Sequence, residues 1–217
     1  LPKYFDKEKY DVRVMLPKYM CMKDEWKEKL QYHTHFYMDL NWRKQYVGVL
    51  EMEYDGIKFY FIDNEYYFNG YAPYGDMYAD IEKFAFFSKA VLSALPLIDF
   101  RPDIIHCHDW QTGLVPVYLD NFRYGNEFYR GIKTVMTIHN LKFQGTWDPK
   151  RVRDITGLPQ YYFAPDKLEA YDDANYLKGG IVYADRVTTV SSSYAEEIKT
   201  PFYGEKLEGL MQARSNC

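Results

Sequence analysis

The sequence predicts an α/β protein of the Rossmann-like class, with a mainly parallel β-sheet and helices on both faces. Strand-like segments alternate with helix-like segments along the chain, which is the order found in parallel α/β folds. Two of the strand-like segments end in polar clusters. The composition, with 47% hydrophobic and 27% charged residues among 217, is that of a globular domain.

The first part of the chain predicts a strand followed by a hairpin. Val12, Val14 and Leu16 alternate with other residues and stop at Pro17, which favours a strand that enters a loop. Residues 47–53 and 57–62 are β-rich and are separated by Asp55 and Gly56, a pair that accepts the positive φ angles of a tight turn. We expect this hairpin to be a local addition to the parallel sheet.

The middle of the chain predicts a long helix and then a short strand. Apolar residues recur at three- and four-residue spacing over 78–95, which places one apolar stripe against a core. Pro102 precedes a strand over 103–106, a loop over 108–112 and a second helix that continues through Leu119.

The last part of the chain continues the alternation. Residues 133–139 form a β-branched strand of the buried kind. A helix over 179–184 precedes a strand over 186–190, and Ser193 with Glu196 indicates a capping box for one more helix.

Composition excludes several classes of protein. The net charge is −4 and no run of Lys and Arg is present, so we expect no nucleic-acid partner. No apolar stretch approaches the roughly 20 residues of a membrane span, and LPKYFDKEKY lacks the features of a signal peptide. Cys21, Cys107 and Cys217 are odd in number and far apart, which favours a reducing compartment such as the cytoplasm.

Both ends of the sequence look cut. The chain has no initiator Met, and it stops at ARSNC without a closing helix or strand.

Two polar clusters carry the candidate chemistry, because the carboxyl ends of parallel strands gather side chains at one crevice. The first contains His106 and His108, which face the same side of an extended chain and imitate part of a metal-ligand set with Asp109. This opens an alternative, a metal-dependent hydrolase. No HExxH or similar motif completes such a site, so we expect no metal, and we expect His106 to be a buried strand residue bonded to backbone.

Asp109 and His139 each have two interpretations. Asp109 follows a buried strand and either caps the next helix or accepts sugar hydroxyls. His139 closes an apolar strand and is followed by Asn140, which tolerates turn geometry and offers both a donor and an acceptor. A lone histidine at a strand end is often only structural.

Phosphate-binding and nucleophile motifs are absent. The sequence has no GxGxxG, no GxxxxGK[ST] and no GxSxG. Lys178, Gly179 and Gly180 imitate a phosphate loop before a helix, but we expect the two glycines to permit close packing there.

Three ordered segments resemble the bacterial glycogen synthase and plant starch synthase family. They are HCHDWQTGLVPVYL at 106–119, TIHNLKFQG at 137–145 and LKGGIVYADRVTTVSSSYAEEI at 177–198, and YAPYGD at 71–76 precedes them. The resemblance covers nearly the whole chain. It implies the amino-terminal half of a two-Rossmann-domain (GT-B) retaining glycosyltransferase, which moves glucose from ADP-glucose to the non-reducing end of an α-1,4-glucan without a metal or cofactor.

The resemblance also implies roles for individual residues. His139 would line the donor glucose, with its backbone carbonyl near the anomeric carbon, and Asn140 would support the same pocket. Asp109 and Trp110 would form the sugar-binding floor, and Tyr74 would meet the glucose or the incoming glucan. Gln111 stands where some relatives have a second His, and Phe143 where many have Tyr, so the chain departs from the family at these two points.

The family pattern extends beyond this chain. Residues 1–217 would be an incomplete amino-terminal domain, lacking the family's first strand, its Lys-Gly-Gly loop and the carboxyl-terminal donor domain that sets the choice of nucleotide. We therefore expect an unpaired strand edge in the sheet and no glucose transfer by this polypeptide alone. The alternative from another class is a stand-alone glucan-binding module.

Overall fold

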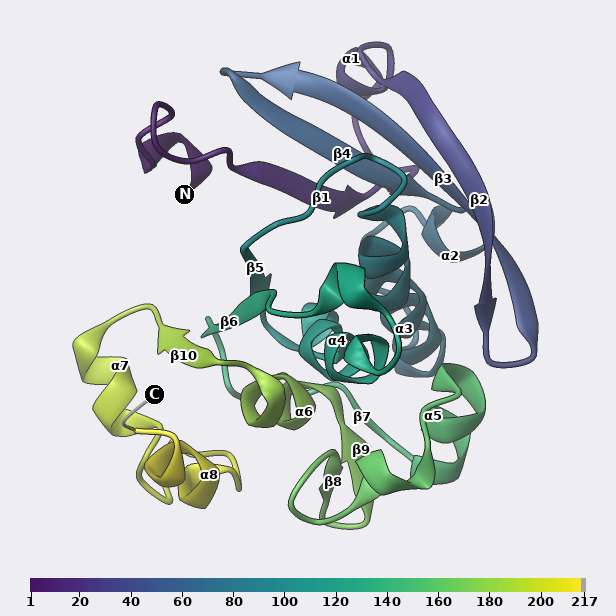
Figure 1. Cartoon of the computed structure of the whole chain (residues 1–217). Helices are drawn as coiled ribbons and strands as arrows, with labels where there is room; N and C mark the ends of the chain where they lie inside the picture. The colour runs from purple at the N-terminus through teal and green to yellow at the C-terminus, as the bar shows by residue number, and fades with distance from the viewer. Residues whose placement is uncertain (216–217) are drawn as a thin grey trace.

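The structure is a computed structural model that describes residues 1–215. Figure 1 shows a strand-rich layer, a central group of helices and a final pair of short helices. The strands are β1 (Arg13–Pro17), β2 (Gln31–Leu40), β3 (Arg43–Tyr54), β4 (Ile57–Asp63), β5 (Ile104–His108), β6 (Lys133–Ile138), β7 (Thr146–Trp147), β8 (Glu169–Ala170), β9 (Asp173–Asn175) and β10 (Arg186–Thr189). The α-helices are α1 (Asp24–Lys27), α2 (Glu65–Phe68), α3 (Met77–Ala94), α4 (Leu114–Arg123), α5 (Pro149–Thr156), α6 (Tyr176–Tyr183), α7 (Ser192–Glu197) and α8 (Glu208–Ala213).

The predicted hairpin is confirmed as β3 and β4. The two strands pair antiparallel from Gly48 with Asp63 to Tyr54 with Ile57. Asp55 and Gly56 have φ of 54° and 67°, the positive values that a type I′ turn requires at both positions. The first predicted strand is also confirmed, because β1 pairs in parallel with β4.

The strands form three sheets rather than one. The first has the order β1-β4-β3-β2, the second is the parallel sheet β10-β6-β5, and the third is the small sheet β7-β9-β8. The expected parallel α/β core is present in the second sheet, but one continuous sheet is wrong for the described residues. In the described residues β1 and β5 each bond to a neighbour on one side only, so these two strands do not join the first sheet to the second.

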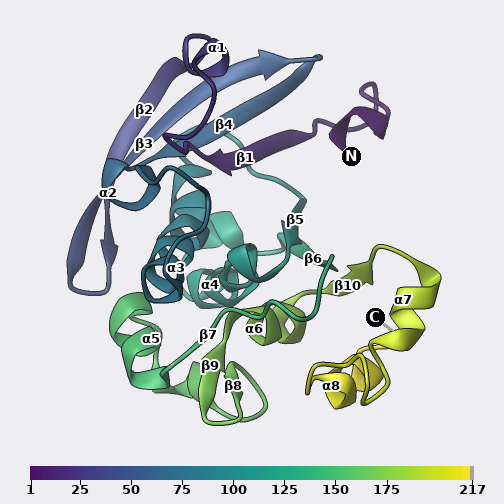
Figure 2. The same cartoon turned by 180° about the vertical axis from the view of Figure 1, so that it is seen from behind.

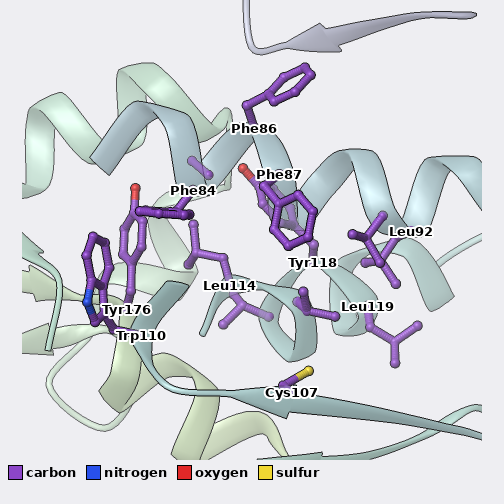
Figure 3. Packing of buried hydrophobic residues seen from close by; sticks show 14 of the residues in the cluster. Phe84, Phe86, Phe87, Leu92, Cys107, Trp110, Leu114, Tyr118, Leu119 and Tyr176 are labelled. Atoms are coloured by element: carbon purple, nitrogen blue, oxygen red, sulfur yellow. The ribbon is translucent and has the colours of Figure 1, made fainter. Parts of the chain in front are cut away.

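Helix α3 is the centre of the hydrophobic core. The helix is confirmed within one residue at each end, but its apolar surface is wider than one stripe, because Phe84, Phe86 and Phe87 are all buried. It contacts β2 and β4 of the first sheet as well as α4 and α5, so its faces are covered on several sides. In Figure 3, Phe84 and Phe87 lie beside Leu114 and Tyr118 of α4, whereas Phe86 points away from α4.

Helix α6 packs closely against the segment that follows β5. A Cβ on Gly180 would lie 3.0 Å from the Cα of Gly113, and a Cβ on Gly113 would overlap the carbonyl of Tyr176. These two glycines therefore permit close packing, as expected for Gly180, and the KGG triplet lies inside a helix rather than in a phosphate loop.

Two local expectations need correction. The 108–112 segment is not a loop, because β5 continues to His108 and a 3-10 helix covers Trp110–Thr112. Helix α7 is capped by Ser191, whose hydroxyl accepts from the backbone N–H of Tyr194 at 3.1 Å. Ser193 therefore lies inside the helix, since the cap needs an extended residue in front of the first turn.

The final helices lie apart from the central group. In Figures 1 and 2, α7 lies on the other side of β10 from α6, and α7 contacts β10. Helix α8 ends at Ala213, so the expected absence of a closing helix is wrong within the described residues, whereas Cys217 lies outside them. None of the helices in residues 1–215 is both long enough and apolar enough to span a bilayer.

Candidate functional site

The candidate site forms where β5 and β6 end side by side. The two strands pair in parallel with His108 opposite Thr137. Because side chains alternate along strands, His106 and His108 share one face with Thr137 and His139. The sequence-based expectation that the two polar clusters lie together at neighbouring strand ends is confirmed by this register.

Asp109 links the two strand ends. Its backbone N–H bonds to the carbonyl of Thr137 at 3.0 Å, and its Oδ1 accepts from the backbone N–H of His139 at 2.8 Å and of Asn140 at 3.4 Å. Asp109 makes no side-chain cap bond to the 3-10 helix that follows it. The capping interpretation is therefore wrong, because the carboxylate points across to the neighbouring strand end.

Asp109 also has unusual backbone geometry, with φ of 55° and ψ of −172°. Residues with a Cβ rarely adopt this conformation, and it costs on the order of 1–3 kcal/mol where it occurs. Such strain persists only where surrounding bonds impose it. Here the three hydrogen bonds that join Asp109 to Thr137, His139 and Asn140 hold it in place.

A row of three histidines lies beside Asp109. The Nε2 of His106 is 2.6 Å from the hydroxyl of Thr137, and the His106 and His108 rings have centroids 4.3 Å apart. The Nδ1 of His108 is 3.0 Å from the Nε2 of His139. His106 is exposed and bonds a side chain, so its expected role as a buried residue bonded to backbone is wrong, because β5 is a sheet edge.

The middle histidine is held neutral. Desolvation, and then the neighbouring His106 and His139, lower the pKa of His108 to about 4. Desolvation and His139 also lower the pKa of His106. Near neutral pH, the N–H of one ring of the His108–His139 pair therefore donates a hydrogen bond to the ring nitrogen of the other, which fixes the orientation of both rings.

The lowered pKa of His108 makes the stability of the folded protein depend on pH. An unfolded histidine titrates near pH 6.5, so between that pH and about 4 the unfolded chain binds a proton at His108 that the folded chain does not. As the pH is lowered through this window, the free energy of unfolding is expected to decrease by about 2 kcal/mol on account of His108. Urea unfolding at pH 7 and pH 4.5 measures this change.

The matched control for this effect is His108→Gln, which keeps a hydrogen-bonding side chain but does not titrate. His106 and the carboxylates are the same in both proteins, so the difference between their pH profiles isolates His108. Equal slopes for the variant and the parent would contradict the assignment.

Trp110 lies beneath the site rather than on its surface. It is 4% exposed, and its ring packs edge-on against Phe84 at 5.0 Å. A side chain at Gly145, where φ is 64°, would overlap the indole ring, so this glycine makes room for it. Figure 3 shows Trp110 beside Tyr176 and Phe84. Trp110 is positioned to support the floor of the site from below.

Tyr74 and Gln111 meet at the edge of the site. The Gln111 amide donates to the Tyr74 hydroxyl at 3.0 Å, and Tyr74 is 57% exposed. The loop that carries Tyr74 is fixed by a buried ion pair on α3, in which Lys83 Nζ lies 2.5 Å from Asp80 and 2.7 Å from the carbonyl of Pro73. Asp80 also accepts from the backbone N–H of Gly75.

Asn140 and its neighbours form a fixed turn after β6. The Asn140 side chain accepts from the backbone N–H of Lys142 at 3.0 Å, and the hydroxyl of Tyr194 accepts from Leu141 N–H at 2.9 Å. The structure thus brings together Asp109, His139 and Asn140 through direct bonds. Tyr74 and Gln111 form a second pair.

The site contains no converging metal-ligand set. Across residues 1–215, no group of three or more His, Cys, Asp or Glu side chains is arranged to hold a metal ion.

Cys107 lies between the two histidines in sequence but is a buried core residue. Burial raises the pKa of its thiol to about 12.

Sequence reasoning missed the coupling of His108 to His139 and the Asp80–Lys83 pair. The i, i+2 spacing of His106 and His108 indicates that the two rings share one face of the strand, but which residue they meet on that face depends on the β5–β6 register. Asp80 and Lys83 stand three apart on a helix, which indicates an ion pair, yet nothing local shows that the pair is buried under the Tyr74 loop.

Comparisons with known proteins agree on one family. The family described as "Starch synthase catalytic domain" matches residues 1–213. A glycogen synthase of Lachnospira eligens is 73% identical over 216 residues and one of Lachnoclostridium phytofermentans is 69% identical over 217, in each case across 100% of this chain and 45% of the relative. The chain thus spans less than half the length of these curated relatives.

One solved structure is similar to this chain over nearly its whole length. It is the catalytic domain of starch synthase IV from Arabidopsis thaliana bound to ADP and acarbose, with a TM-score of 0.85 and 27% identity over 99% of this chain and 44% of that one.

Proposed function

The chain belongs to the starch synthase catalytic domain family, and from this premise we propose that it is the amino-terminal, acceptor-binding half of a glycogen or starch synthase. The complete enzyme transfers glucose from ADP-glucose to the non-reducing end of an α-1,4-glucan with retention of configuration. The observation that carries this proposal is the 73% identity to a glycogen synthase across the whole chain. The ADP and acarbose of the Arabidopsis structure support a nucleotide donor and a sugar acceptor.

We assign the reacting end of the donor sugar to His139. Positive charge develops at the anomeric carbon as the nucleotide departs, so fixed dipoles aimed at that carbon stabilise the transition state most. Asp109 fixes the backbone at His139 and Asn140, and His108 fixes the His139 ring. This arrangement supports a role for His139 in which its backbone carbonyl and its ring both face the sugar.

We assign the acceptor side to Tyr74 and Gln111. Their mutual hydrogen bond and the exposed ring of Tyr74 provide a flat surface with polar groups at its edge, which suits a sugar. Asn140 supports the donor pocket, and Trp110 supports the floor from the core. In this proposal the nucleotide is held by a carboxyl-terminal domain that acts as the partner of this half.

The proposed compartment is the cytoplasm. Cys21 and Cys107, the cysteines within residues 1–215, are both free thiols, which suits a reducing environment.

Transfer assays on the complete enzyme test the function. Glycogen and maltotriose serve as acceptors, and radiolabelled ADP-glucose and UDP-glucose serve as alternative donors. We expect label from ADP-glucose in α-1,4-linked product. Glycogen binding without transfer from either donor would instead assign the protein to the glucan-binding modules.

A further inference from the structure

Thr112 bonds the backbone at the end of β5 with a single hydroxyl. Its Oγ1 accepts from the backbone N–H of His108 at 2.7 Å and donates to the carbonyl oxygen of the same residue at 2.8 Å. It also lies 3.4 Å from the carbonyl oxygen of Asp109, which accepts from the Thr112 backbone N–H at 3.2 Å. One short side chain thus contacts both residues that precede the 3-10 helix.

These bonds take the place of a neighbouring strand. Successive residues of a strand direct their backbone groups to opposite sides. Asp109 directs its N–H toward β6, where it bonds the carbonyl of Thr137, so His108 directs its N–H and carbonyl to the side of β5 that faces away from β6. A hydroxyl can donate and accept at once. The Thr112 hydroxyl satisfies both groups of His108 and thereby ends the strand there.

The bonds of Thr112 also act on the strained backbone of Asp109, where φ is 55° and ψ is −172°. The His108 carbonyl belongs to the peptide before Asp109, and the Asp109 carbonyl belongs to the peptide after it. Because Thr112 bonds both carbonyls, it holds the two peptide planes between which these torsions are defined. Strain persists only where the surroundings impose it, and Thr112 imposes it from the side opposite β6.

The 3-10 helix that carries Thr112 is itself fixed in the core. Trp110 is 4% exposed and packs against Phe84, as Figure 3 shows. Gly113, the residue after Thr112, lies too close to the carbonyl of Tyr176 to accept a side chain. A rigid base of this kind allows one hydroxyl to hold a strand end in a precise geometry.

The carboxylate of Asp109 depends on this backbone. It reaches the N–H of His139 at 2.8 Å and that of Asn140 at 3.4 Å, and the backbone conformation of a residue determines which directions its side chain can take. The Thr112 hydroxyl bonds to His108 and Asp109. Its influence on the His139 peptide therefore passes through the Asp109 carboxylate.

We propose that Thr112 is a positioning residue for the transfer reaction, whose hydroxyl holds Asp109 in the conformation from which its carboxylate fixes the peptide at His139. This inference rests on the proposed function, because it adds a residue to that same site. A hydroxyl that only helps to start helix α4 would affect stability and leave turnover unchanged.

The test removes the hydroxyl in the complete enzyme and keeps the shape of the side chain. Thr112→Val is expected to lower kcat by about tenfold, since small misplacements at a reacting centre are costly, while the Kd for maltotriose stays close to that of the parent. Thr112→Ser keeps the hydroxyl and is expected to recover most of the loss. The matched control is Thr156→Val on α5, which removes a hydroxyl that accepts from the Leu158 N–H and is expected to leave kcat unchanged.

A double-mutant cycle identifies the route of the effect. The Asp109→Ala enzyme has no carboxylate to position, so adding Thr112→Val to it is expected to lower kcat by less than about twofold. A full tenfold fall in that background would contradict the proposal, because Thr112 would then act without Asp109. A Thr112→Val enzyme with the turnover of the parent, or a serine variant no more active than the valine variant, would contradict it equally.

An amide resonance reports the position of the peptide without any need for activity. In enzyme that contains isotope-labelled histidine, the His139 amide signal is expected to shift in Thr112→Val but not in Thr156→Val, because its N–H bonds the Asp109 carboxylate. An unshifted signal in Thr112→Val would overturn the proposal. If thermal melting shows that Thr112→Val is unfolded, the smaller Thr112→Ala variant carries the same expectations. Failure of the proposed function is separate, because it is the absence of transfer by the parent enzyme.

Discussion

His139→Ala in the complete enzyme is expected to lower kcat by about 100- to 1,000-fold, the range seen when one transition-state dipole is removed, while affinity for glucan stays close to that of the parent. The ring is lost, and with it the bond to His108, whereas the bonds from Asp109 to the backbone at the strand end remain. The acceptor-side residues Tyr74 and Gln111 keep their own hydrogen bond. Steady-state kinetics with ADP-glucose, together with titration of maltooligosaccharides, measure both quantities.

The control for His139→Ala is His108→Gln, at the histidine whose ring bonds to the His139 ring. This variant keeps a side chain that can donate to or accept from His139, so kcat is expected to fall much less. Turnover of His139→Ala within about threefold of the parent would remove His139 from the catalytic residues. A large parallel loss of glucan affinity would instead indicate a collapsed site.

The elements that could be predicted from the sequence are those specified by local chemistry. Asp55 and Gly56 favour a tight turn whatever surrounds them, and the β3–β4 hairpin follows. The apolar spacing over 78–95 gives helix α3 because its period is a property of that segment alone. The meeting of Asp109 with His139 was also within reach, since parallel strands end at a common edge.

The features that could not be predicted depend on contacts distant in sequence. Nothing near Asp109 shows that its carboxylate accepts from His139 rather than capping the next turn, because the bond spans 30 residues. The division of the strands into three sheets depends on which edges are paired. The docking of Trp42 on Asp154 spans 112 residues, so the hydrophobic pattern of either segment contains no sign of it.

Asp109 combines a strained backbone with a bond that crosses to His139, and substitutions can separate the two. The conformation at φ 55° and ψ −172° is one that glycine adopts readily and other residues do not. The carboxylate, by contrast, fixes the His139 and Asn140 N–H groups. Glycine therefore relieves the strain and removes the anchor, alanine removes the anchor alone, and asparagine keeps an acceptor oxygen.

We expect Asp109→Gly and Asp109→Ala to lower kcat by about 100-fold or more, since fixed geometry at the reacting carbon accounts for much of the rate. Asp109→Asn is expected to lose less. In urea unfolding, the free energy of unfolding of Asp109→Gly is expected to exceed that of Asp109→Ala by about 1–2 kcal/mol, because only glycine adopts this conformation without strain.

The decisive comparison is between the kinetic and the stability order of these variants. If Asp109 serves only the fold, the more stable glycine variant should also be the more active one. If it positions the His139 peptide, glycine and alanine should be equally inactive despite their different stabilities, and asparagine should be the most active of the three. The second pattern is expected, because the carboxylate of Asp109 is the group that holds both N–H groups at the end of β6.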